Sequence, residues 1–140
     1  MKYLKLIILF FFWAGSLSFC QEGIKDFDEI IYEARTRGSS LVLKITSDKL
    51  FYKDRNHEKE LKVSKVDKKK LIKFINNTKL SDMSHFKAVS NDRASDRAMQ
   101  AELIVKVNGQ EYKSSVFDHG NPPEELKEII ETMMRLGKPE

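Results

Sequence analysis

The amino-acid sequence predicts an α+β fold, in which an antiparallel sheet of about six strands carries two helices on one face. Two observations predict it. Segments with alternating apolar side chains follow one another through short turns, first over 27–63 and again over 101–116, and a stretch of helical periodicity follows each run. Because strands joined by short turns lie antiparallel, the order β-β-β-β-α-β-β-α favours this layered fold over a parallel α/β fold.

The first run predicts four strands and one helix. Apolar alternation and turn residues place the strands at about 27–37, 41–45, 50–53 and 61–63. Ser64, with Asp67 three residues later, fits the start of a helix over about 65–79. The long polar segment 80–98 that follows predicts an irregular loop, which we expect Met83, Phe86 and Val89 to fix against the core.

The second run predicts a hairpin with a defined register. Apolar residues alternate over 101–107, and Asn108-Gly109 follows directly. This dipeptide tolerates the positive φ angles of a type I′ turn, which places Ala101 opposite Val116. Tyr112 and Val116 are then expected on the inner face of the sheet.

A second helix is predicted after the hairpin. Asn121 can cap it by accepting the amide of Glu124, and Pro122 suits its first position. Gly137 can end it in a left-handed conformation. Its apolar stripe, which we expect to cover the hairpin, consists of Leu126, Ile129, Ile130, Met133 and Leu136.

The N-terminus has the form of an export signal. Two lysines precede an apolar run that is too short to span a bilayer, so we expect a signal peptide over 1–20, a tether over 21–26 and a single domain over 27–137. Two interpretations of its end stay open. Leu17–Cys20 resembles a lipoprotein box that would leave a lipid on Cys20, whereas ordinary cleavage would release the chain before Gln21. The expected location is periplasmic or secreted, or membrane-anchored only through Cys20.

Charge and cysteine content narrow the classes of partner. Removing segment 1–20 leaves 23 basic and 21 acidic residues, a balance that argues against a nucleic-acid partner. Cys20 is the only cysteine, so no intramolecular disulfide is expected. We expect a monomer whose partner is an envelope protein or a small anionic ligand.

Two stretches resemble a known group of sequences. Tyr32–Ser40 and Tyr112–Leu126 are similar to a family of small, uncharacterised exported proteins of Bacteroidetes-type bacteria. The resemblance covers most of the mature chain and implies export. It implies no activity, cofactor or catalytic residue.

Five polar residues form the candidate binding site: Arg35, Arg37, Asp96, Asp118 and His119. Two arginines near the first turn, together with a polar loop and the start of the last helix, would suit a carboxylate or a phosphate. The other interpretation is local loop architecture, in which the aspartates accept backbone amides and pair with the arginines.

The sequence predicts neither a catalytic centre nor a bound cofactor or metal. It contains no H-E-x-x-H, no G-x-S-x-G and no glycine-rich phosphate loop. The leading hypothesis is therefore a non-catalytic exported domain that binds a ligand or partner. The alternatives are a metal-assisted hydrolase that uses His85, His119 and loop aspartates, and a proteinaceous inhibitor.

Overall fold

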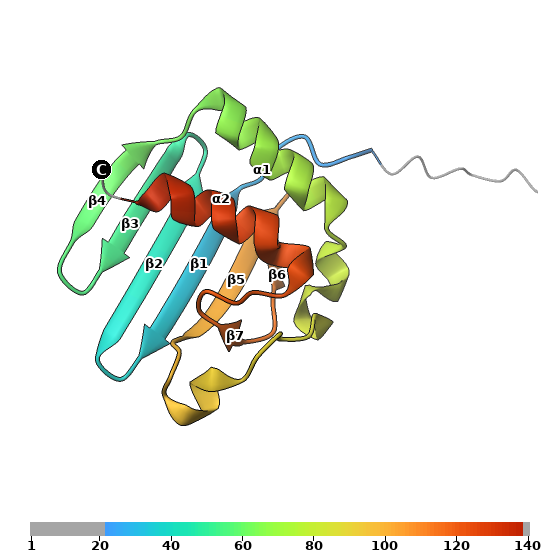
Figure 1. Ribbon diagram of the computed structural model, residues 1–140. Helices are drawn as coiled ribbons and strands as arrows, with labels where there is room; N and C mark the ends of the chain where they lie inside the picture. Colours follow the sequence, from blue (N-terminus) through green and yellow to red (C-terminus); the bar gives the residue numbers. More distant parts are fainter. Residues whose placement is uncertain (1–21, 139–140) are drawn as a thin grey trace, which may run out of the picture.

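The computed structural model describes residues 22–138 and confirms the predicted α+β fold with one antiparallel sheet (Figure 1). The strands lie in the order β4-β3-β2-β1-β5-β6, and the short β7 pairs with β5 beyond the end of β6. Their bounds are β1 Glu29–Thr36, β2 Ser39–Thr46, β3 Lys49–Asp54, β4 Glu58–Lys62, β5 Gln100–Val107, β6 Gln110–Lys113 and β7 Phe117–Asp118. The predicted signal peptide, its predicted cleavage site and Cys20 lie outside the described residues.

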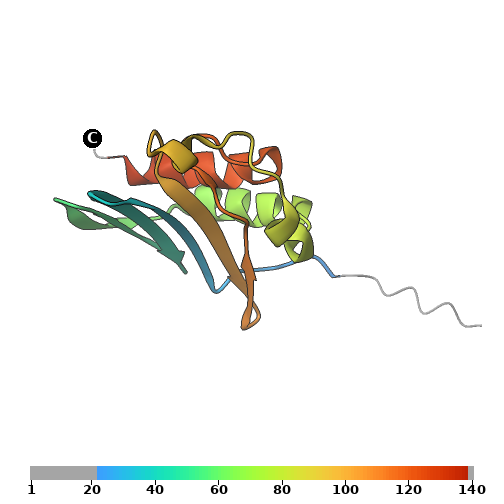
Figure 2. The ribbon, with the colours of Figure 1, turned by 90° about the horizontal axis from the view of Figure 1, so that it is seen from below.

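Both helices cover the same face of the sheet, as the second view shows (Figure 2). They are α1, Lys65–Asn77, and α2, Lys127–Gly137. Leu71 and Ile75 of α1 and Met133 of α2 have 0% exposure, and full burial of such side chains stabilises by about 1.5–3 kcal/mol each. Within residues 22–138 no helix has the length and apolarity needed to cross a membrane.

Alternation along the strands separates the two faces of the sheet. In β1, Ile30, Tyr32 and Ala34 are at most 1% exposed and face the helices. The opposite face carries charged residues that pair across strands, such as Lys106 with Glu29 at 2.8 Å. The core therefore lies in the single layer between sheet and helices.

The final hairpin departs from the predicted register at its far end. Asn108 and Gly109 have φ angles of 51° and 75°, as a type I′ turn requires. However, Ala101 lies opposite Phe117 rather than Val116. The Ser114 hydroxyl accepts the Leu103 amide at 2.9 Å, which ends the regular pairing, and the extra residue leaves Val116 40% exposed.

The predicted ends of the last helix were both wrong. A 3₁₀ turn, η3 (Glu124–Leu126), precedes α2, and the Asn121 amide donates to the Ser90 hydroxyl at 2.8 Å instead of capping a helix. Gly137 does not have a positive φ angle. Its role is close packing, because a Cβ at this position would lie 2.7 Å from Cδ2 of Leu43.

The predicted irregular loop contains two 3₁₀ helices, η1 (Leu80–His85) and η2 (Asp92–Ser95). Met83 is buried and Phe86 is half-buried, as predicted, but Val89 is 62% exposed. Part of the predicted tether lies against α1, where the Ile24 amide donates to Oδ1 of Asn76 at 2.7 Å.

Candidate functional site

A cleft of about 290 Å³ lies where the end of β1 meets the start of β5. The antiparallel register places Arg35 opposite Gln100, and η2 lies just before β5 in the chain, so three segments meet at this end of the sheet (Figure 1). The residues that line the cleft are Arg35, Thr36, Arg37, Arg93, Asp96, Ala98 and Gln100.

Arg35 and Arg37 are the two residues of β1 and its turn that bring positive charge to the lining of this cleft. The Arg35 guanidinium lies 3.3 Å from Glu33 and 3.5 Å from Glu102, but its side chain is 66% exposed, so water weakens these pairs. Arg37 makes no hydrogen bond or ion pair with any residue of 22–138. The guanidinium of Arg37 is therefore available to a ligand.

Arg93 is held from behind by a buried carboxylate. Its Nη1 donates to Oδ1 of Asp118 at 3.0 Å and to the Ser90 carbonyl at 2.8 Å. The Arg93 side chain is 19% exposed and that of Asp118 is 2% exposed. The pair thus fixes the guanidinium of Arg93, which is one of the residues that line the cleft.

The surroundings of Asp118 explain why it stays ionised. Its carboxylate accepts the backbone amides of Asp92 at 2.7 Å and Arg93 at 3.0 Å, and the Ser90 hydroxyl also donates to it. Burial by itself would raise the pKa of Asp118, but these hydrogen bonds outweigh burial and lower its pKa well below its usual range. The carboxylate organises the loop and has no surface left for a ligand.

His119 is not among the residues that line the arginine cleft. Its Nδ1 lies 2.7 Å from the Tyr32 hydroxyl, and Tyr32 is fully buried beneath the helices. Burial lowers the pKa of His119, which favours the neutral ring at this contact. Ser90 donates to Asp118 and not to the imidazole, so Ser90, Asp118 and His119 do not form a catalytic triad.

The residues of the hydrolase hypothesis do not converge. His85 is exposed and contacts the Ser84 hydroxyl at 3.2 Å, whereas His119 contacts Tyr32. Across residues 22–138 no group of three or more His, Cys, Asp or Glu side chains is placed to hold a metal ion.

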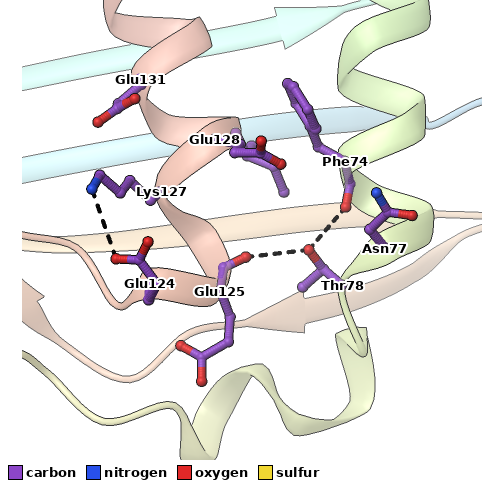
Figure 3. Close-up of a pocket in the computed structure, with 9 residues that line it drawn as sticks. Phe74, Asn77, Thr78, Glu124, Glu125, Lys127, Glu128 and Glu131 are labelled. Atoms are coloured by element: carbon purple, nitrogen blue, oxygen red, sulfur yellow. Dashed lines mark hydrogen bonds and ion pairs between the residues drawn. The ribbon is translucent and has the colours of Figure 1, made fainter.

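A larger groove of about 410 Å³ separates α1 from the start of α2 (Figure 3). The Thr78 hydroxyl lies 2.9 Å from the Phe74 carbonyl and 3.3 Å from the Glu125 carbonyl, and it joins the two helices there. Four glutamates and a single lysine line the groove: Glu124, Glu125, Glu128, Glu131 and Lys127. Its negative charge disfavours the anion that the sequence predicts.

The structure therefore divides the predicted site. Arg35, Arg37 and Asp96 share one cleft, Asp118 is joined to it through Arg93, and the half-buried His119 contacts Tyr32 of the core instead. Arg93 belongs to the polar loop that the sequence marked together with Asp96, although it is not one of the five selected residues. Gln100 was not predicted, because no local pattern marks it.

Fold and cleft together define the class of protein: an antiparallel α+β domain with an arginine-lined cleft at one end of its sheet. The chain matches no protein-family model, no curated protein and no solved structure.

Proposed function

We propose that the chain is an exported, non-catalytic binding domain whose cleft takes a carboxylate or phosphate from a small ligand or an envelope partner. The observation that carries this proposal is the meeting of three arginines, Arg35, Arg37 and Arg93, in one cleft with a single aspartate in its lining. Export is supported by the signal-like segment 1–20.

Arginine is the side chain best suited to this role. Its planar guanidinium carries five donors and can contact a carboxylate or phosphate through two parallel hydrogen bonds. Arg93 uses only Nη1 in its contacts with Asp118 and Ser90. Its remaining donors, held at the cleft by a buried partner, would bind an anion with little loss of side-chain freedom.

Asp96 sets the geometry of the rim. It ends η2 with a φ angle of 54°, a left-handed conformation that aspartate tolerates better than most residues. As the single carboxylate of the cleft lining, it also favours a ligand that carries a hydrogen-bond donor beside its anionic group.

Titration with inorganic phosphate and with acetate tests the proposal. We expect the purified protein to bind at least one of them at low ionic strength, and Arg37→Gln to weaken that binding by about tenfold, which corresponds to roughly 1.4 kcal/mol. Binding should also decrease with added salt because the rim is exposed.

The matched control is Arg135→Gln. Arg135 lies on α2, where it pairs with Asp67 at 2.7 Å, so the substitution removes the same charge outside the cleft. Equal loss of affinity in both variants would mean that only net charge matters. No binding of either anion would contradict the proposal.

A further inference from the structure

A second depression lies beside the arginine cleft at the β1–β2 turn. It is shallow, has a volume of about 340 Å³ and contains no acidic residue in its lining. Thr36 and Arg37 line both hollows, so the two hollows adjoin at these residues. The remaining residues that line it are Gly38, Ser39, Ser40 and Arg55.

Arg55 reaches this depression from the β3–β4 turn. Its Nη1 donates to the Gly38 carbonyl at 3.1 Å. Its own turn is fixed by Asp54, whose Oδ1 accepts the amides of Asn56 and His57 at 2.7 Å each. Arg55 is therefore held at the β1–β2 turn by the conformation of its own turn and by its hydrogen bond to Gly38.

The arginines of the chain concentrate at this end of the sheet. The β1–β2 turn, the β3–β4 turn and η2 all lie there (Figure 1). Of the six arginines in the sequence, Arg35, Arg37, Arg55 and Arg93 line the two hollows. Several guanidinium groups in one region can bind several anionic groups of one ligand at once. A single small anion would contact only some of these guanidinium groups.

The other side chains of the lining indicate the class of ligand. Hydroxyl and amide groups from Thr36, Ser39, Ser40 and Gln100 are suited to hydrogen bonds with sugar hydroxyls. Among the described residues no aromatic side chain lines either hollow. Single-stranded nucleic acids are usually bound by stacking on such side chains, so these hollows fit them poorly.

We infer that the two hollows are subsites of one site for an acidic oligosaccharide, with Arg37 between them. This inference rests on the proposed function and extends it from one anionic group to at least two on the same ligand. Arg93 and Arg35 hold one acidic sugar, and Arg55 holds the next one across the turn.

Binding of galacturonic acid and of its oligomers of two to four residues tests this inference by calorimetry with the purified protein. We expect affinity to rise by about tenfold or more from the monomer to the longest oligomer, because the second contact is made within one complex. Arg55→Gln should abolish this gain. Arg37→Gln should weaken the binding of the monomer and of the oligomers, whereas Arg135→Gln should weaken neither.

The outcomes separate the two proposals. If phosphate or the monomer binds but affinity does not rise with length, or if Arg55→Gln retains the gain, the two-subsite inference is wrong and the proposed function stands. If no anion binds, both fail. Tighter binding of a single-stranded oligonucleotide than of the tetramer would contradict the ligand class. Thermal melts of each variant check that it is folded.

Discussion

At the scale of single residues, the contact between Tyr32 and His119 links the core to the surface. Tyr32 is fully buried, and burial raises the pKa of its hydroxyl, which stays neutral and lies 2.7 Å from Nδ1 of His119. Protonation of His119 would place a charge against the core. The neutral ring is therefore the form that the fold stabilises.

This contact predicts a dependence of stability on pH. Because burial lowers the pKa of His119 below its ordinary value of 6.5, the unfolded chain takes up the proton first. The contribution is fully present above pH 6.5 and is lost as the pH falls through the lower folded pKa. Urea unfolding at pH 7.5 and 5.5 should show a decrease in the free energy of unfolding, and His119→Gln should reduce that decrease. An unchanged decrease would contradict the prediction.

At the scale of elements, local sequence patterns correctly predicted the features that depend only on residues close together in the chain. The cap at Ser64 formed, with the Asp67 amide donating to the Ser64 hydroxyl at 3.1 Å, because both partners lie within one turn. The cap at Asn121 did not form. Its side-chain amide instead donates to the hydroxyl of Ser90, which lies 31 residues earlier in the chain. The register of the last hairpin was right beside Asn108-Gly109 and wrong at Ala101, beyond the bulge at Ser114.

The same limit applies to the candidate site: local patterns marked individual residues but not which of them meet in space. Arg35 and Arg37 were selected because they stand at a turn, but their meeting with Asp96 depends on the pairing of β1 with β5, which no local signal encodes. Arg55 was not predicted at all. Its contact with Gly38 arises because the β1–β2 turn and the β3–β4 turn lie at the same end of the sheet.

Close packing of α2 on the sheet predicts the effect of Gly137→Ala. The new Cβ would lie 2.7 Å from Cδ2 of the buried Leu43 and 3.3 Å from Cδ2 of Tyr52. Overpacking of this kind costs about 1–3 kcal/mol, and the better helix propensity of alanine returns less than about 1 kcal/mol. We expect a net loss of about 1 kcal/mol in urea unfolding.

The matched control is Gly38→Ala. No atom lies within 4 Å of a Cβ at Gly38, so this substitution should change stability by less than about 0.5 kcal/mol. An equal change in the free energy of unfolding for both substitutions would show that close packing does not require glycine at position 137.

At the scale of the whole molecule, charge is divided between two regions. Arginines line the hollows at the β1–β2 end, whereas glutamates line the groove between α1 and α2. The uncovered face of the sheet is different again, because its charges pair with one another, as Lys113 does with Glu102 at 3.0 Å. The hollows at the β1–β2 end therefore favour an anionic ligand, and the groove between α1 and α2 disfavours one.

The contacts of Asp118 with the loop before β5 predict what keeps Arg93 in position at the β1–β2 end of the sheet. Asp118 of β7 holds the segment that carries Arg93 through two backbone amides and the guanidinium, so Asp118→Asn removes the charge on which these contacts depend. We expect faster hydrogen exchange at the amides of Asp92 and Arg93 and about tenfold weaker phosphate binding.

Acid should have the same effect as this substitution, but only at low pH. Since hydrogen bonds lower the pKa of Asp118, the stability that it contributes is present above its ordinary value of 3.8 and is lost as the pH falls through the lowered pKa. Slow exchange at residues 92 and 93 should therefore persist at pH 5 in the natural chain and be absent in Asp118→Asn. Ser95→Ala, which removes only an exposed contact of the hydroxyl with the Asp92 carbonyl at 3.1 Å, is the control. If Asp118→Asn exchanges as slowly as this control, the buried carboxylate does not hold the loop, and the fixed position of Arg93 must have another cause.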